Sequence, residues 1–274
     1  MLGTAFPANR ILLVEQPGGW GSGGLTGSRF DPAVAERLIG RLGRQGIRVL
    51  AIRRPGRQPA PARRAWGFAD CRPDRQGMVW GSYSAPAELL DLDPAMLAEQ
   101  ARDTSPVYAV CAHGTRDMCC AIEGRPVATA LARERPGRVW ECSHLGGDRF
   151  AANVLVLPTG QLYGRITDSA ELVAATEAGR TVPDRLRGQV GLPAAAQAAV
   201  VHAQRQLALP LVGAIRPLEV RGSPPEVQLV RLQLPNGRCT VGVQRVTGAP
   251  AILTCRDVKA KVPLSYRPLW LRSD

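Results

Sequence analysis

One stretch of the sequence, residues 111–150, gathers most of the side chains that could bind a metal. It contains four of the seven cysteines and two of the three histidines. The candidate ligands in this stretch are Cys111, His113, Cys119, Cys120, Cys142, His144 and Asp148. Cysteine thiolates bind zinc and iron–sulfur clusters, and a neutral imidazole or a carboxylate suits metals of borderline softness. The residue types in this stretch therefore indicate a metal or cluster site.

The spacing of four of these residues places them at the ends of two neighbouring strands. Cys111 ends one apolar run, and Cys120 follows it nine positions later. His144 ends the next apolar run, and Asp148 lies four positions beyond it, across a pair of glycines. Strands joined through a helix are parallel, so their carboxyl ends lie at the same edge of the sheet. We therefore expect Cys111, Cys120, His144 and Asp148 to converge on one point.

The rest of the chain predicts the strands and helices that must position these residues. Apolar runs predict strands at residues 11–15, 47–52, 78–83, 107–111, 139–142, 251–255 and 264–271. Capping residues and helical spacing predict helices at residues 32–45, 94–101, 126–132, 169–178 and 193–207. Turn residues predict hairpins within residues 153–166 and 227–245. A segment rich in Pro, Arg and Gly, residues 53–77, is predicted to be a loop.

The order of these elements predicts an α/β fold in three parts. Residues 103–215 contain a strand, a helix, a strand, a hairpin and a helix in turn, which is the thioredoxin-like plan. Residues 1–102 form an N-terminal α/β domain that is a candidate degenerate copy of this plan, although the sequence shows no repeat. Residues 216–274 form a C-terminal β-rich segment. A length of 274 residues agrees with about two domains of ordinary size.

Composition excludes several classes of protein. With 45% hydrophobic and 21% charged residues, the chain is typical of globular proteins rather than disordered ones. No apolar run reaches about 18 residues, so we expect no transmembrane helix. The N-terminus does not resemble a secretory signal, so we expect a cytoplasmic protein. An odd number of cysteines in such a chain argues against a disulfide framework.

Residues 107–165 resemble the sucrase/ferredoxin-like family. Cys111 and Cys120 match the family's pair of cysteines separated by eight residues, and His144 matches the first histidine of its H-x-G-G-H motif. The resemblance implies a thioredoxin-like ferredoxin domain that binds a [2Fe–2S] cluster and transfers one electron at a time. It implies Cys111, Cys120 and His144 as cluster ligands. The rest of the chain resembles the bacterial full-length members more loosely.

The sequence departs from the family motif at the second histidine, where Asp148 stands. If Asp148 binds iron, the site carries one negative charge more than a two-histidine site and one fewer than a four-cysteine site. We therefore expect a reduction potential between those of the two types. Two alternatives stay open. Cys119 could replace Cys120, and Cys142 could replace Asp148, because Cys142 shares a strand face with His144.

Three other functions are alternatives to electron transfer: zinc binding, thiol oxidoreductase activity and glycosidase activity. A structural zinc site in an interaction module is the main alternative, because zinc accepts two cysteines, a histidine and an aspartate. A thiol oxidoreductase needs a C-x-x-C motif at a helix N-terminus, and the sequence contains none. A glycosidase needs two positioned carboxylates, and no pair stands out. We therefore expect a redox protein rather than a hydrolase, and we assign no catalytic residue.

The net charge of +12 limits the kinds of partner that the chain could bind. Only Lys259 and Lys261 are lysines, so arginine supplies nearly all of the positive charge. Nucleic-acid-binding proteins usually show a basic stripe with interleaved aromatic residues, and this chain shows none, so we expect no nucleic-acid partner. A basic surface could instead bind an acidic redox partner, such as a reductase or a ferredoxin.

Overall fold

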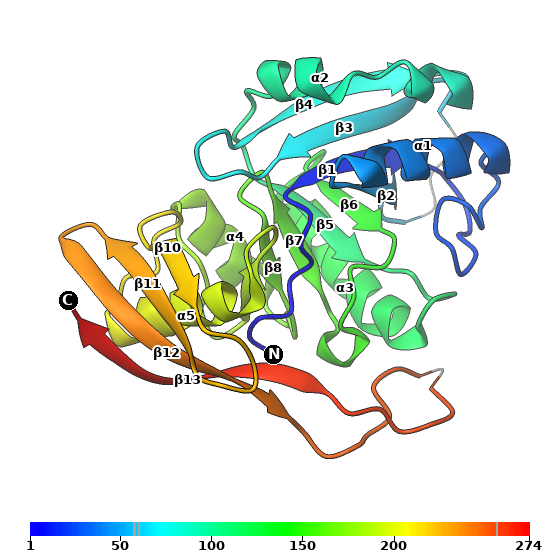
Figure 1. Ribbon diagram of the computed structural model, residues 1–274. Coiled ribbons are helices and arrows are strands. Elements are labelled where there is room, and N and C mark those ends of the chain that lie inside the picture. The colour runs from blue at the N-terminus through cyan, green and yellow to red at the C-terminus, as the bar shows by residue number, and fades with distance from the viewer. Residues whose placement is uncertain (57–58, 60, 256) are drawn as a thin grey trace.

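The main body of the protein is one mixed sheet of nine strands (Figure 1). The computed structural model describes residues 1–56, 59, 61–255 and 257–274. Across the sheet the strands lie in the order β4-β3-β1-β2-β6-β5-β7-β8-β9. Their bounds are β1 Arg10–Glu15, β2 Ile47–Arg53, β3 Arg64–Asp70, β4 Gly77–Tyr83, β5 Val107–Cys111, β6 Val139–Cys142, β7 Val154–Leu157, β8 Gln161–Tyr163 and β9 Leu186–Gln189. This architecture confirms the predicted α/β class.

The sheet consists of two halves with the same topology. In each half a helix joins two parallel strands, and an antiparallel hairpin and a further helix follow. The helices of the first half are α1 (Pro32–Arg44) and α2 (Pro94–Gln100), which follows the short helix η1 (Pro86–Leu90). Those of the second half are α3 (Met118–Glu134) and α4 (Ser169–Glu177). The first half therefore repeats the strand plan of the second, in agreement with the hypothesis of a degenerate copy.

The two halves join through β2 and β6, which are antiparallel. Only the carboxyl ends of these strands pair, with Ile52 opposite Cys142 and Arg53 opposite Glu141. Arg53 strengthens the junction because it forms an ion pair of 2.8 Å with Glu141. The sheet thus continues across the predicted boundary at residue 102, and the three predicted domain ranges remain predictions.

Three apolar clusters form the core of the sheet, and one of them links the halves. One cluster lies under α1 and α2, and a second lies under α3 and α4. The third cluster contains residues of both halves. They include Leu13, Leu50, Cys111, Trp140, Cys142 and Leu155. Burial of a large apolar side chain contributes about 2 kcal/mol, so this shared cluster gives the two halves a common source of stability.

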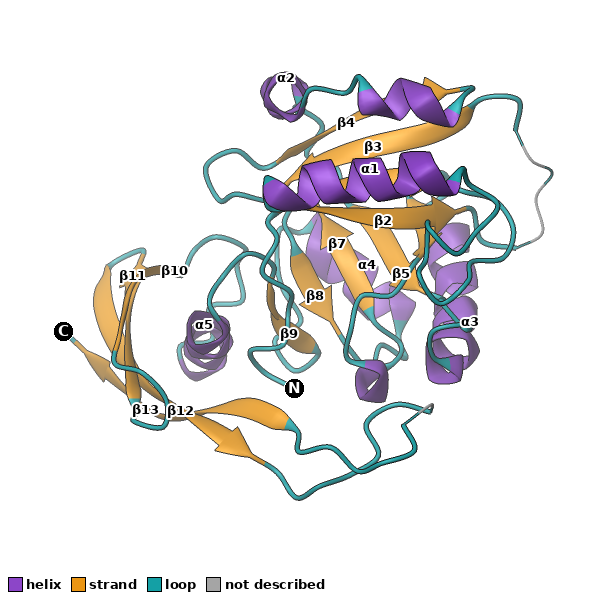
Figure 2. Cartoon of the chain, turned by 45° about the vertical axis from the view of Figure 1, so that its right-hand side comes forward, coloured by secondary structure: helices purple, strands orange, loops and turns teal. Residues whose placement is uncertain are grey.

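The C-terminal segment is a helix packed on a separate antiparallel sheet. Alanines of α5 (Ala194–Gln206) pack against this sheet, whose order is β10-β11-β12-β13. Its strands are β10 Arg216–Arg221, β11 Gln228–Leu234, β12 Gly237–Thr247 and β13 Leu264–Ser273. The long strands β12 and β13 carry their connecting loop, described at residues 248–255 and 257–263, to the start of α3 (Figure 2). Within the described ranges, no helix is long and apolar enough to cross a bilayer.

Three local predictions are wrong. The predicted loop 53–77 contains β3. The aromatic residues Trp66 and Phe68 favour a strand there, and Gly67 leaves room for the ring of Trp80. Residues 57, 58 and 60 of this predicted loop lie outside the described residues. The predicted strand 251–255 forms only an isolated bridge between Ala251 and Lys261.

The third error concerns the start of α3, which lies at Met118 rather than at Pro126. Asp117 caps the helix by accepting the backbone N–H of Cys119 at 2.9 Å. This cap and the burial of Val127 and Leu131 outweigh the cost of a proline inside the helix. Cys119 and Cys120 therefore lie in the first turn of α3.

Candidate metal centre

The first two candidate ligands come from β5 and α3. Cys111 is the last residue of β5, and Cys120 is the third residue of α3; both are about 1% exposed. Gly124 allows the helix to approach the strand this closely, because a Cβ there would lie 2.1 Å from the carbonyl oxygen of Cys111. The helix thus directs Cys120 toward Cys111.

The other two candidates come from the loop after β6. His144 follows this strand, and Asp148 begins the short helix η2 (Asp148–Phe150). Gly147 between them has a φ of +75°, which favours glycine, and a Cβ there would lie 2.5 Å from the guanidinium of Arg187. This turn returns the chain, so that Asp148 Oδ1 lies 3.1 Å from Nδ1 of His144.

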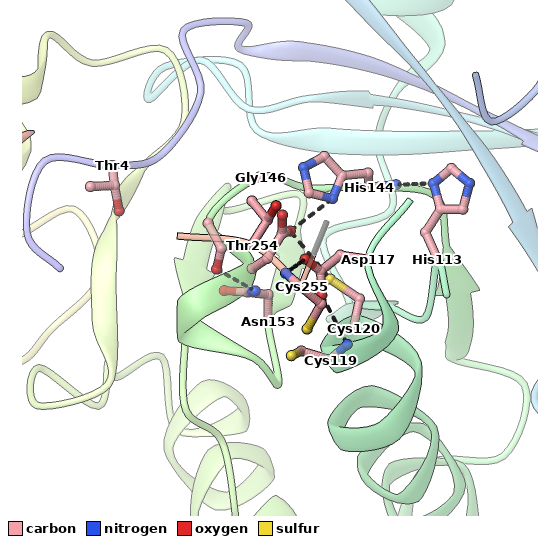
Figure 3. A network of polar contacts seen from close by, with 12 residues as sticks. Thr4, His113, Asp117, Cys119, Cys120, His144, Gly146, Asn153, Thr254 and Cys255 are labelled. Atoms are coloured by element: carbon pink, nitrogen blue, oxygen red, sulfur yellow. Dashed lines mark hydrogen bonds and ion pairs between the residues drawn. The ribbon is translucent and has the colours of Figure 1, made fainter. Parts of the chain in front are cut away.

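Three of the four predicted ligands form one close group, and the fourth contacts two of its members. Figure 3 shows Cys120 and His144 of this group. The sulfurs of Cys111 and Cys120 and a ring nitrogen of His144 lie within 4.8 Å of one another. The thiol of Cys120 donates a hydrogen bond of 3.4 Å to Asp148 Oδ1, which adds the carboxylate to the group. Two sulfurs and a ring nitrogen thus form one group, and the Asp148 carboxylate lies beside it, in contact with Cys120 and His144.

The group of three ligand atoms includes neither of the two rival cysteines. Cys119 lies with Asp117 and Cys255 in a second group of potential ligands. Cys142 lies opposite Cys111 in the sheet and is buried in the same apolar cluster as Cys111 and Cys120, and burial raises the pKa of its thiol well above the ordinary value. The assignment of the ligands themselves remains a prediction.

The protonation states of the site suit metal binding. Hydrogen bonding with Cys120, with His144 and with the backbone N–H of Leu145 lowers the pKa of Cys111 well below its usual value. Hydrogen bonding with Cys111 and burial raise the pKa of Cys120. Burial raises the pKa of Asp148. These hydrogen bonds therefore favour the thiolate form of Cys111, which is the form that binds a metal.

A buried nitrogen of His144 supports a bound metal. Nδ1 is shielded from solvent and has no hydrogen-bond partner among the described residues, although the Asp148 carboxylate is nearby. A buried polar atom without a hydrogen bond is costly, and binding to a metal removes that cost. The residues present therefore fit a metal or cluster.

His113 and the first half of the sheet hold the backbone of His144 in place. The backbone N–H of His144 donates to Nδ1 of His113 at 3.2 Å, and Nε2 of His113 lies 2.7 Å from the carbonyl oxygen of Gly21. Since Nδ1 accepts, Nε2 carries the proton and donates to Gly21. Arg48 donates to the carbonyl oxygen of His144 at 2.7 Å. His113 thus positions His144 through its backbone.

Arg187, a residue of β9, supports the glycine turn, and no motif in the sequence indicates this role. Its side chain is 1% exposed and donates to Asn153 Oδ1 at 2.7 Å and to the carbonyl oxygen of Gly146 at 2.8 Å. Burial lowers its pKa to about 10. This arginine places a positive charge near the thiolate of Cys111, which it favours.

His144 lies between two cavities that open at the surface. One, of about 390 Å³, is also lined by Asp148 and by the loop between β12 and β13. The other, of about 220 Å³, is lined by the loop after β1. Basic residues that we call the basic rim line one or both cavities: Arg48, Arg116, Arg149 and Lys261. The side chain of His144 is 24% exposed, so it connects the site to this surface.

Comparison with known proteins agrees with the sequence motif. The profile of the family described as Sucrase/ferredoxin-like matches residues 37–188, which is more than half of the chain and includes all four candidate ligands. No curated protein matches the chain, and no solved structure does. The match confirms the resemblance that the motif indicates. This chain belongs to the sucrase/ferredoxin-like family.

Proposed function

We propose that this chain binds a [2Fe–2S] cluster and transfers single electrons. The observation that carries the proposal is the group of two sulfurs and a ring nitrogen within 4.8 Å, in a segment that matches this family. The ligands are Cys111, Cys120, His144 and Asp148. When bound, such a cluster accepts one electron and releases it to a partner.

The side chains of the site have separate roles in binding. Cys111 supplies a thiolate that hydrogen bonds already favour. Cys120 must lose its proton when a metal binds, because the thiolate is the form that binds a metal, and the proton passes to solvent. Binding thus releases a proton from Cys120, and affinity increases with pH until the thiol has ionised.

His144 provides the route for electrons to the surface. Its ring is partly exposed between the two cavities, whereas both cysteines are buried. Its backbone is held by His113 and Arg48, so the ring needs little rearrangement during electron transfer. The basic rim surrounds this exposed edge. We infer that the redox partner is an acidic protein that docks on the rim.

A structural zinc site is the second candidate, and one observation favours it. Ligand atoms within 4.8 Å of one another suit a single tetrahedral ion, because Zn–S bonds of about 2.3 Å place two sulfurs about 3.8 Å apart. Two irons require the cysteine pair and the His144–Asp148 pair to be further apart. The glycine turn before Asp148 permits such a movement.

Anaerobic purification followed by metal and sulfide analysis separates the two functions. Under the proposal the protein is red-brown and contains about two irons and two sulfides per chain, and dithionite bleaches it and produces an S = 1/2 EPR signal. A colourless protein with one zinc and no sulfide would establish the zinc module instead. Cys111→Ser should abolish the colour, whereas Cys239→Ser, a buried cysteine of β12, should retain it.

A further inference from the structure

A second group of thiols lies beside the candidate metal centre and takes no part in it. Cys119 in the first turn of α3 and Cys255 in the loop between β12 and β13 come together with Asp117. Their two sulfurs and a carboxylate oxygen lie within 4.8 Å of one another (Figure 3). Segments far apart in the sequence therefore meet at this point.

One carboxylate joins the two cysteines through their backbones. Asp117 Oδ1 accepts the N–H of Cys119 at 2.9 Å, and Oδ2 accepts the N–H of Cys255 at 2.8 Å. The helix cap therefore also binds the loop. Each carboxylate oxygen accepts a backbone N–H, and the carboxylate also forms hydrogen bonds with both thiols.

Exposure distinguishes these two thiols from the others. Cys255 is exposed and Cys119 is half-buried, whereas the remaining five cysteines are buried. Cys255 is therefore the thiol that a soluble oxidant reaches first, and Cys119 is the partner within reach of it.

We propose that Cys119 and Cys255 form a reversible disulfide that fastens the loop between β12 and β13 over the metal centre. Rotation of the two side chains can bring sulfurs within 4.8 Å to bonding distance, because the backbones are already held together by Asp117. The loop supplies Leu253 and Thr254 to the wall of the cavity beside His144. The disulfide thus fixes that wall.

A low-molecular-weight disulfide such as oxidised glutathione is the oxidant. The thiolate of Cys255 attacks one of its sulfurs, which forms a mixed disulfide and releases one glutathione. The thiolate of Cys119 then attacks the sulfur of Cys255 and releases the second glutathione. The two protein thiols lose two electrons and two protons, and two molecules of reduced glutathione carry them. Excess thiol reverses both steps.

Peptide mapping tests the disulfide in the metal-loaded protein. Oxidised glutathione under anaerobic conditions should remove two hydrogen masses and link the tryptic peptide of Cys119 to that of Cys255. Cys255→Ser should prevent the link, as should Cys119→Ser, whereas Cys239→Ser, a buried control, should leave it unchanged. Glutathione adducts without the link would overturn the proposal. Zinc bound to the reduced wild type and lost in Cys255→Ser would also overturn it, because the pair would then be a metal site.

Chelator access tests the effect on the centre. Oxidation should slow release of the bound metal to EDTA several-fold in the wild type and leave Cys255→Ser unchanged. An equal rate before and after oxidation would show that the disulfide does not control access. Both readouts apply whether the bound metal is iron or zinc, so failure of this proposal and failure of the electron-transfer function are distinguishable.

Discussion

The backbone N–H of His144 donates to Nδ1 of His113 at 3.2 Å, so the position of this candidate ligand depends on a neutral histidine in the loop after β5. Burial lowers the pKa of His113 below its ordinary value of 6.5. The unfolded chain therefore binds more protons than the folded chain below pH 6.5, and the folded site loses stability as the pH falls. Protonation also removes the acceptor for His144.

Metal release should therefore accelerate below pH 6.5 in the wild type. In His113→Gln, release should be faster at neutral pH and depend less on pH, which stopped-flow absorbance with a chelator measures. His202→Gln is the control, because His202 lies on α5, outside the contacts that hold His144. Equal pH profiles for the wild type and His113→Gln would contradict this role.

Asp148 sets the charge of the proposed cluster. Replacement of two cysteine ligands by two histidines raises the reduction potential from about −400 mV to about −150 mV or above. Removal of one negative charge from the ligands therefore raises the potential by on the order of 100 mV. Asp148→His should therefore raise the reduction potential by on the order of 100 mV, measured by an EPR-monitored redox titration. Cys142→Ser should leave potential and spectrum unchanged. A spectrum altered by Cys142→Ser but not by Asp148→His would identify Cys142 as the fourth ligand.

The basic rim should accelerate docking of an acidic partner. Arg116→Glu combined with Arg149→Glu should lower the rate of electron transfer from an acidic ferredoxin about tenfold at low salt, because attraction becomes repulsion. Arg245→Glu changes the net charge on exposed β12, away from the rim, and should have a much smaller effect. A rate that is unchanged between low and high salt would exclude this surface as the docking site.

Much of the fold follows from local signals in the sequence. Asp31 and Asp93, each before a proline, mark the starts of α1 and α2, because cap and proline act within one turn. The junction of β2 and β6 has no such signal. It depends on two residue pairs separated by about 90 positions in the chain, and tertiary contacts alone bring them together.

The site could be predicted in part, because most of its residues lie close together in the sequence. Cys111, Cys120, His144 and Asp148 belong to one β-α-β unit, so strand topology brings them together. Arg187 and the loop of Cys255 reach the site from outside that unit. Their positions depend on the packing of β9 and of the C-terminal sheet, which no spacing in the sequence encodes.

Gly124 should be essential for the contact between α3 and β5. In Gly124→Ala the new Cβ would lie 2.1 Å from the carbonyl oxygen of Cys111, so the helix must move away from the strand. Overpacking of this kind costs about 1–3 kcal/mol, which chemical denaturation measures, and metal affinity should fall with it. Gly40→Ala is the matched control, because Gly40 lies on α1 with only the end of Arg44 nearby, at 3.8 Å. It should stabilise the protein by about 0.5–1 kcal/mol.

Asp117 should stabilise two structures at once, the first turn of α3 and the loop of Cys255. Asp117→Ala and Asp168→Ala each remove a helix cap and should each lower the free energy of unfolding by about 1 kcal/mol. Only Asp117 also accepts the N–H of Cys255, so only Asp117→Ala should release the loop. Limited trypsin digestion at Lys259 and Lys261 should then proceed faster in Asp117→Ala than in Asp168→Ala. Equal cleavage in the two variants would mean that β12 and β13 hold the loop without this carboxylate.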